Sequence, residues 1–174
     1  DLSKYNVVPR KTKILKFPMK EQKYNYDCGV AAAWSVLRYF GERPNYIQLL
    51  NGSGVDSDNG LPPYMLVELL NCFGLDAELE GFRSIRFIKN EIFHEKPVIT
   101  LFQMRKGYGK SWNKSWDYGH YIVVIGYDRN RLFIYDPWIG GMRVLTNDMF
   151  RARWHDTSEG IKYIKPCITI NEEL

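Results

Sequence analysis

The sequence contains no apolar stretch that approaches the roughly 18–20 uninterrupted residues of a membrane helix, so this chain is not expected to span a bilayer. Positive charge is only in slight excess, because 24 lysines and arginines face 20 aspartates and glutamates, a net charge of +4. A nucleic-acid partner usually requires clustered lysine and arginine on a more basic domain, so none is expected. The three cysteines cannot all pair, which argues against a disulfide framework and leaves at least one thiol free.

Apolar residues are plentiful, since 45% of the 174 residues are hydrophobic and 15% are aromatic. This composition excludes a disordered, collagen-like or low-complexity chain. The length allows one well-buried core and no internal repeat is present, so we expect residues 1–174 to form a single domain. The chain starts with Asp1 and shows no signal peptide, which indicates a processed chain, a trimmed one or a piece of a longer protein.

Hydrophobic periodicity predicts helices in the first half of the chain. The clearest spans residues 28–40, where apolar residues recur at helical spacing. Asp27 is placed to cap the start of this helix, and Gly41 is placed to end it. Weaker patterns predict helices over 45–50, 62–73 and 84–94, and turn residues predict a surface loop over 51–60.

The second half of the chain has a different character. The basic first twenty residues predict only an edge strand or a lead-in. β-branched and aromatic runs then predict strands over 97–104, 121–127, 131–136 and 163–170. Helices followed by a mostly antiparallel sheet indicate an α+β fold, with the N-terminal helices packed on the sheet.

Cys28 is the thiol best placed for chemistry. It lies in the first turn of the predicted helix, where unpaired backbone N–H groups and the helix dipole stabilise a thiolate, the reactive form. The neighbouring Gly29 lets another part of the chain approach closely. Cys72 and Cys167 lie inside apolar runs, where a free cysteine is usually a buried small hydrophobe. Cys28 is therefore the candidate nucleophile, and the other two are expected to be structural.

A thiol nucleophile needs a base within hydrogen-bond reach and a third group that orients the base. Of the three histidines, His94 is expected to end a helix and His155 to lie in an exposed charged stretch. His120 differs because it opens a buried strand. If that strand forms a hairpin with the next one, His120 lies nearly opposite Asp136, which Pro137 holds in an extended conformation.

Gln22 is a candidate donor to an oxyanion. It precedes Cys28 by six residues, across a short loop that could fold its amide back toward the thiol. A side-chain amide and the backbone N–H of the nucleophile would together form a two-donor oxyanion hole. Taken alone, Gln22 would be read as a surface residue.

These residues lie in a pattern that resembles the bacteriocin-processing cysteine peptidases, the papain-like enzymes that act on double-glycine leaders. The first part is QKYNYDCGVAA at 22–32, followed by YFG at 39–41. The second part is GHYIVVIGY at 119–127, followed by FIYDP at 133–137. The parts occur in the order and local spacing of the family. Its members are often the peptidase domain of a peptide-exporting transporter, so a bacterial chain is implied, in the cytoplasm or secreted.

The resemblance implies a papain-like fold and a thiol-dependent peptidase without a cofactor. Cys28 would be the nucleophile, His120 the general base and later acid, Asp136 the orienting carboxylate and Gln22 the oxyanion-hole amide. The substrate would be a peptide or protein, hydrolysed at a peptide or isopeptide bond through an acyl-enzyme, with small or glycine residues before that bond. Residues that bind the substrate are not indicated.

The chain also departs from the transporter-linked members. No membrane helices or ATPase follow the pattern here, so the chain looks closest to the stand-alone members, although association with a transporter or a larger toxin remains open. Residues 103–118, rich in lysine, glycine and tryptophan, are expected to form an added loop at the mouth of the site that gates substrates. Residues 138–154 have a similar composition.

Three other functions remain open from the sequence. The same triad could transfer the acyl group to another amine, or deamidate a glutamine. The chain could also be a non-catalytic papain-like binding module, although such modules usually lose the cysteine or the histidine. Cys28, His120 and Asp136 are acceptable metal ligands, but the sequence has no CxxC or HxxxH spacing, so no metal is expected.

Overall fold

The structure is a computed structural model that describes residues 11–172. Its helices are α1 (Cys28–Tyr39), α2 (Tyr46–Gly52), α3 (Pro63–Cys72), α4 (Ile85–Phe93) and α5 (Asn147–Arg153), with a short 3₁₀ helix at Trp112–Lys114. Its strands are β1 (Lys13–Ile14), β2 (Ala77–Glu80), β3 (Val98–Gln103), β4 (Gly119–Tyr127), β5 (Arg131–Asp136), β6 (Gly141–Thr146), β7 (His155–Ser158), β8 (Ile161–Ile164) and β9 (Cys167–Ile170). Arg10, which belongs to the predicted lead-in, lies outside the described residues.

Most of the strands belong to one seven-stranded sheet. Its order is β2-β9-β3-β4-β5-β6, and β1 pairs with β4. The strands β7 and β8 form a separate hairpin. All of these pairings are antiparallel, which confirms the predicted α+β fold.

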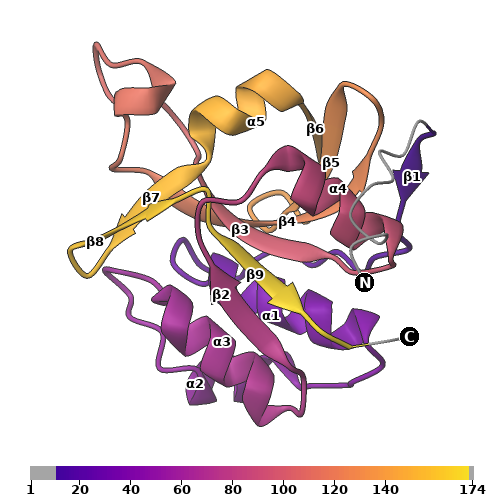
Figure 1. Ribbon diagram of the computed structural model, residues 1–174. Coiled ribbons are helices and arrows are strands. Elements are labelled where there is room, and N and C mark those ends of the chain that lie inside the picture. Colours follow the sequence, from indigo (N-terminus) through magenta and orange to yellow (C-terminus); the bar gives the residue numbers. More distant parts are fainter. Residues whose placement is uncertain (1–10, 173–174) are drawn as a thin grey trace.

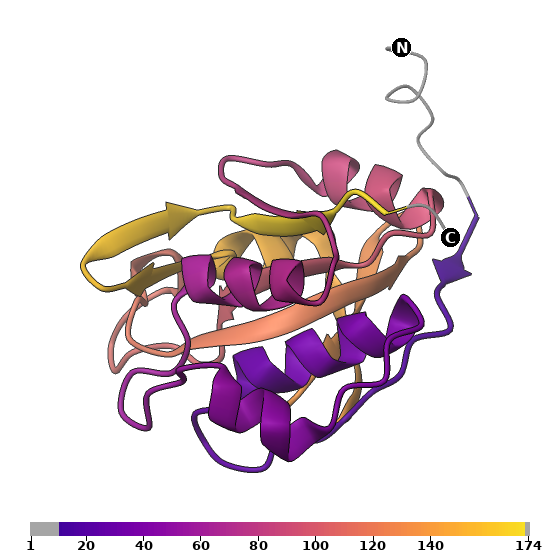
Figure 2. The ribbon, with the colours of Figure 1, turned by 90° about the horizontal axis from the view of Figure 1, so that it is seen from below.

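Helices cover both faces of the large sheet (Figure 1). On one face α1, α2 and α3 pack against Tyr121, Val123 and Ile125 of β4, and Figure 2 shows these helices in front of the strands. On the other face α4 and α5 pack against Ile122 and Val124. Because successive side chains of a strand point to opposite faces, β4 is buried on both sides, which explains its continuous apolar run.

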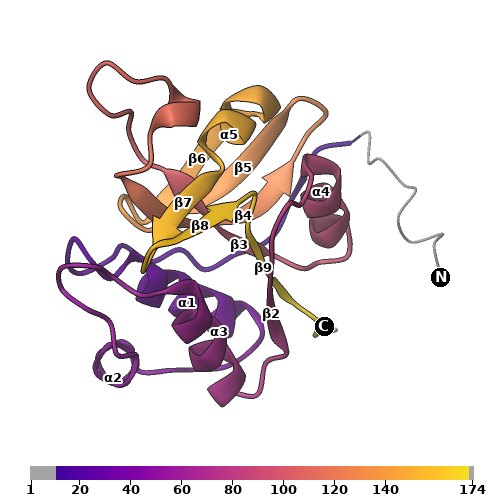
Figure 3. The same ribbon diagram turned by 60° about the vertical axis from the view of Figure 1, so that its left-hand side comes forward.

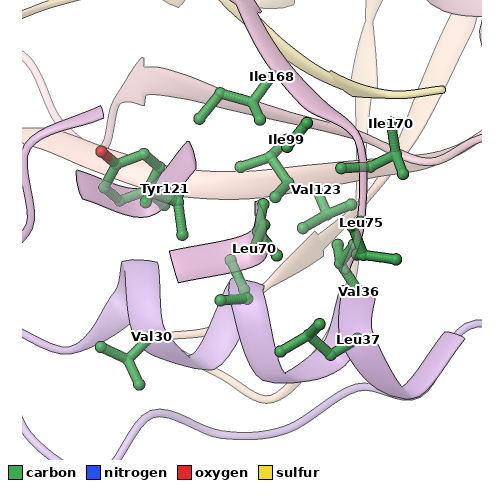
Figure 4. Close-up of a cluster of buried hydrophobic side chains, with 14 of the residues drawn as sticks. Val30, Val36, Leu37, Leu70, Leu75, Ile99, Tyr121, Val123, Ile168 and Ile170 are labelled. Atoms are coloured by element: carbon green, nitrogen blue, oxygen red, sulfur yellow. The ribbon is translucent and has the colours of Figure 1, made fainter. Parts of the chain in front are cut away.

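The helix α1 lies at the centre of the larger core cluster. Val30, Val36 and Leu37 are fully buried, at the helical spacing that the sequence shows. Figure 4 shows these side chains with Leu70 of α3 and Val123 of β4 between the helices and the sheet. Burying a valine or leucine side chain contributes about 1.5–3 kcal/mol relative to leaving it exposed, so this face holds the first residue of α1 firmly beside β4.

Two predictions about the C-terminal part were wrong. The strand expected over 163–170 is divided between β8 and β9, because Lys165 has a φ of 47° and Pro166 cannot donate to a sheet ladder. Residues 138–154, which had the composition of an added loop, include β6 and α5. The strand β6 lies at the edge of the sheet with mostly exposed side chains, so its sequence carries little apolar alternation.

The expected burial of Cys72 was also wrong. The side of α3 that faces the core carries Pro63, Leu66 and Leu70, whereas Cys72 is exposed at the end of the helix. Cys167 is fully buried on β9, as expected. Burial raises the pKa of its thiol well above the usual value, which makes this cysteine unreactive.

No helix within residues 11–172 combines the length and the apolar character that crossing a membrane requires.

Candidate active site

Three different elements bring Cys28, His120 and Asp136 together. Cys28 is the first residue of α1, His120 is the second residue of β4, and Asp136 is the last residue of β5. Gly29 allows the close approach of α1 to β4, since a Cβ atom at that position would lie 3.0 Å from the ring of Tyr121. The Tyr121 hydroxyl donates a hydrogen bond to the Leu61 carbonyl at 2.7 Å. Tyr121 follows His120 in β4, so this bond fixes the strand next to the histidine.

His120 and Asp136 form a buried pair. The distance from His120 Nε2 to Asp136 Oδ1 is 2.6 Å, and the two residues are 5% and 1% exposed. In the β4–β5 ladder Val123 pairs with Tyr135, which puts Asp136 diagonally across from His120 rather than directly opposite. Asp136 also accepts hydrogen bonds from the Trp138 backbone N–H at 2.9 Å and from Arg143 Nε at 2.5 Å. The carboxylate is therefore fixed from three sides.

The surroundings of the pair favour its charged form. Burial alone would lower the pKa of His120, but the charge and hydrogen bond of Cys28, together with Asp136, raise that pKa to about 9. Burial alone would likewise raise the pKa of Asp136, yet its hydrogen bonds, foremost that from His120, hold it below the usual value. Because Nε2 of the imidazole faces Asp136, Nδ1 is the nitrogen available to the Cys28 sulfur.

Gln22 lies beside this group but does not line its cavity. Its backbone N–H donates to the Pro137 carbonyl at 2.8 Å, which ties the preceding loop to the residue after Asp136. Its side-chain Nε2 donates to the Tyr24 carbonyl at 2.5 Å, and its Oε1 is buried without a hydrogen-bond partner among the described residues. The residue is only 9% exposed, so it is not an ordinary surface glutamine. One N–H of its amide remains after the bond to Tyr24.

The side chain of Asp27 does not cap α1 as the sequence suggested. Asp27 makes no capping hydrogen bond to the helix, and its carboxylate turns back toward the preceding loop. It accepts hydrogen bonds from the backbone N–H groups of Lys23 at 2.9 Å and Tyr24 at 2.7 Å, and from the Tyr46 hydroxyl at 2.6 Å. Fully buried, it organises the turn between Gln22 and Cys28.

Replacing Asp27 with asparagine should weaken this turn. The NH₂ group of asparagine cannot accept a hydrogen bond, so at least one of the three donors would lose its acceptor. We therefore expect a loss of about 1–3 kcal/mol in the free energy of unfolding, measured by urea denaturation. The exposed Asp76→Asn is the control, and equal stability of the two variants would contradict the role of Asp27.

A cavity of about 620 Å³ opens at Cys28 and His120. One wall comes from residues 54–65, the loop after α2 and the start of α3, and the other comes from residues 116–121 and 156–159. Figures 1 and 3 both show the tip of the β7–β8 hairpin near the loop that precedes α3. The cysteine and the histidine are therefore accessible from a space large enough to hold several residues of a peptide.

The loop 103–118 is firmly attached next to this cavity. The Arg153 guanidinium lies 4.3 Å from the ring centre of Phe102 and 4.2 Å from that of Trp112, and it donates to the backbone carbonyls at both 103 and 104. His155 Nε2 lies 2.7 Å from the carbonyl oxygen of Ser115. Residues 116 and 117 line the cavity, which places the end of the loop at its mouth.

His155 and Asp156 are buried, although the sequence suggested an exposed charged stretch. They are 6% and 8% exposed, and Asp156 lines the cavity. Burial raises the pKa of the Asp156 carboxyl to about 6, although hydrogen bonds from Thr157 and Gln103 and the charge of His120 oppose the change. The only sequence signal was the adjacent Trp154, a large apolar residue that is itself 1% exposed.

The described residues contain no group of three or more histidine, cysteine, aspartate or glutamate side chains arranged to hold a metal ion.

A helix that starts with cysteine, packed against a sheet that carries a histidine and an acid, defines the papain-like cysteine peptidases as a class. The chain belongs to the Peptidase_C39 like family, whose model matches residues 14–161. It is therefore a cysteine peptidase, a hydrolase. The match to the family model confirms the family resemblance that the motifs at 22–41 and 119–137 indicated.

Solved structures of the same kind have the same fold. A C39-like peptidase from Bacillus anthracis matches with a TM-score of 0.71 at 17% identity, over 94% of this chain and 98% of that chain. A double glycine motif protease from an AMS/PCAT transporter, in complex with its leader peptide, matches with a TM-score of 0.66 at 20% identity, over 95% and 99%. The peptidase domain of Streptococcus ComA, a bifunctional ABC transporter of quorum sensing, matches with a TM-score of 0.66 at 21% identity, over 89% and 98%. A comparison with curated proteins gives no match.

Proposed function

We propose that the protein hydrolyses a peptide bond through a covalent thioester on Cys28, with His120 and Asp136 completing a catalytic triad. The observation that supports this most directly is the buried His120–Asp136 hydrogen bond of 2.6 Å beside a cavity that Cys28 also lines. A nucleophile, a base and a group that orients the base are the three parts that thiol catalysis needs.

The reaction follows from the charges of these groups. The Cys28 thiolate attacks the substrate carbonyl carbon, forms a C–S bond and pushes the carbonyl electrons onto oxygen. The His120 imidazolium then gives its proton to the leaving amine as the C–N bond breaks. In the second half, the neutral imidazole takes a proton from water, the hydroxide attacks the thioester, and the C–S bond breaks to release the acid and the thiolate.

The oxyanion of each tetrahedral intermediate needs hydrogen-bond donors that are already in place. We assign this role to the backbone N–H of Cys28 and to the remaining amide N–H of Gln22. Two contacts support the assignment of Gln22. Its backbone N–H donates to the carbonyl of Pro137, the residue after Asp136, and Asp27 fixes the turn that joins Gln22 to Cys28.

A small residue, glycine above all, is the proposed substrate residue on the acyl side of the bond. The support is the structural likeness to a protease of the double glycine motif. The likeness to peptidase domains of transporters also supports an association of this chain with an exporter of peptides. Both proposals rest on likeness of fold, and the peptides described next test the first of them.

A peptide electrophile tests the nucleophile directly. A chloromethyl ketone that ends in Gly-Gly should alkylate Cys28 and block activity, because the reagent occupies the acyl side of the cavity. Tryptic mass mapping should locate the label on Cys28, although Cys72 is the more exposed thiol. Labelling of Cys72 at an equal rate, with Cys28 unmodified, would contradict the proposal.

The products of a Gly-Gly peptide library separate hydrolysis from its alternatives. Hydrolysis gives a new carboxylate and a new amine at the same bond. Acyl transfer would give a peptide joined to an added amine, and deamidation would convert a glutamine to glutamate without breaking the chain. We expect cleaved peptides, and mass spectrometry of the mixture with and without added glycinamide shows which product forms.

A further inference from the structure

The cavity at Cys28 has a charge opposite to that of the chain as a whole. The protein carries a net charge of +4, yet no lysine or arginine of the described part lines this cavity. Its acidic lining residues are Asp56, Asp58, Asp117, Asp156 and Glu159. The acids come from both walls, so any peptide lying in the cavity passes between negatively charged groups. A concave site lined by charges of one sign has a stronger electrostatic potential than a flat surface.

Asp156 is the acid that lies against the residue before His120. A Cβ atom added to Gly119, the residue before His120, would collide with the Asp156 carboxylate, so this group lies directly against the start of β4. It is only 8% exposed. Its side-chain partner among the described residues is the amide of Gln103, whose Nε2 lies 3.2 Å from Oδ1, and no lysine or arginine pairs with it.

An acid that is buried without a basic partner is costly unless something compensates it. Burial already raises the pKa of Asp156 to about 6, and the group still loses its proton at neutral pH. Its folded-state pKa lies above the usual value, so the ionised form reduces stability as the pH rises through about 6. A cation brought by the substrate would remove this cost.

The other acids divide into two groups. The carboxylate of Asp56 accepts two backbone N–H bonds of its own loop at 2.8 Å, and Asp117 pairs with Lys110 at 3.3 Å. Asp58 and Glu159 form no ion pair within residues 11–172. Both are exposed at the rim, one on each wall, where they can attract a cation before it reaches Asp156.

We propose that the cavity selects peptides with a lysine or arginine close to the cleaved bond, and that Asp156 is the specificity-determining residue. This rests on the proposed peptidase function, since the same cavity supplies Cys28. Lysine and arginine fit better than a metal ion, because the described acids form no group of three that could hold one. An ammonium or guanidinium needs only one buried carboxylate and one or two at the rim.

Matched peptides test the preference. Each carries Gly-Gly before the expected bond and differs at one scanned position, which is lysine, norleucine or glutamate. We expect kcat/KM to be at least about tenfold higher for lysine than for norleucine at one or two positions, and lowest for glutamate, as expected for a partly buried ion pair. The difference should lie mainly in KM and should shrink in high salt. Equal values for the three peptides would overturn the proposal.

Variants locate the preference on Asp156. In Asp156→Asn the lysine-to-norleucine ratio should fall to within about threefold, because the buried charge is gone. If that variant does not fold, the rim variant Asp58→Asn/Glu159→Gln serves instead and should lower the ratio in part. The control Glu78→Gln, an exposed acid on β2, should leave it unchanged. A full ratio in Asp156→Asn would overturn the role of Asp156.

Binding distinguishes this proposal from the peptidase function itself. The Cys28→Ala protein is expected not to cleave the peptides, so fluorescence anisotropy with the labelled lysine and glutamate peptides measures binding in the cavity alone. Tighter binding of the lysine peptide supports the charge preference even if no peptide is cleaved by the wild type, which would contradict the peptidase proposal. Cleavage of all peptides with equal binding would leave the peptidase proposal intact and overturn the charge preference.

Discussion

Replacing Cys28 with alanine should reduce kcat/KM for a cleaved peptide by at least about 10⁴-fold, since loss of a nucleophile removes the covalent route altogether. The change deletes one half-buried sulfur atom in the first turn of α1, while the buried face of the helix, from Val30 onward, is untouched. The thermal unfolding midpoint should therefore move little. Initial rates from a fluorogenic Gly-Gly peptide and a thermal melt together measure both quantities.

Two other cysteines provide the controls for this experiment. Cys72→Ala changes an exposed residue and should leave both activity and stability unaltered. Cys167→Ala changes a fully buried residue on β9 and should lower stability by about 1–2 kcal/mol, without removing activity from the protein that is folded. A fall of less than about 100-fold in kcat/KM for Cys28→Ala would contradict the nucleophile assignment.

The sequence allowed the fold class and the family to be predicted because local signals were strong. The apolar spacing within α1 and the continuous apolar run of β4 each identify one element, and both elements carry a motif residue at their start. The short hairpin loop after β4 then restricted Asp136 to the neighbourhood of His120. The actual pairing is diagonal, because the ladder begins with Tyr127 opposite Leu132, and the bulge between Val124 and Gly126 then brings Asp136 one residue closer to His120.

The details that the sequence could not supply depend on contacts between distant segments. The carboxylate of Asp27 could have capped α1, but it turns back to the preceding loop, where one of its hydrogen bonds comes from Tyr46, nineteen residues later in the chain. Asp156 lies in a charged stretch that is typical of a surface. Its burial follows from the packing of β7 against β3 and β4, which pairing patterns within one segment cannot reveal.

The same packing explains how two acids of different character, Asp136 on the large sheet and Asp156 on the β7–β8 hairpin, lie near one histidine. Asp136 receives hydrogen bonds from a histidine, an arginine and a backbone N–H, so it stays charged. Asp156 receives hydrogen bonds from Thr157 and Gln103 and pairs with no lysine or arginine within residues 11–172, and burial raises its pKa to about 6. Groups with strongly perturbed pKa values cluster at functional sites, which agrees with the position of both acids beside His120.

Two substitutions of Asp136 separate the orientation of His120 from its charge. Asp136→Ala removes the acceptor of the Nε2 hydrogen bond and leaves the imidazole free to turn away, so kcat/KM should fall by about 10³-fold. Asp136→Asn retains an oxygen that can accept the same hydrogen bond, so the fall should be only about tenfold. The exposed Asp148→Asn is the control and should behave as the wild type.

The pH dependence of kcat/KM gives the second readout for these variants. In the wild type the alkaline limb should lie near pH 9, because activity is lost as the His120 imidazolium gives up its proton and Cys28 and Asp136 raise its pKa to about 9. Both substitutions remove a negative charge that favours the imidazolium, so the limb should move to lower pH in each. An unchanged limb in Asp136→Asn, combined with a wild-type rate in Asp136→Ala, would show that His120 acts without this carboxylate and that Asp136 is only structural.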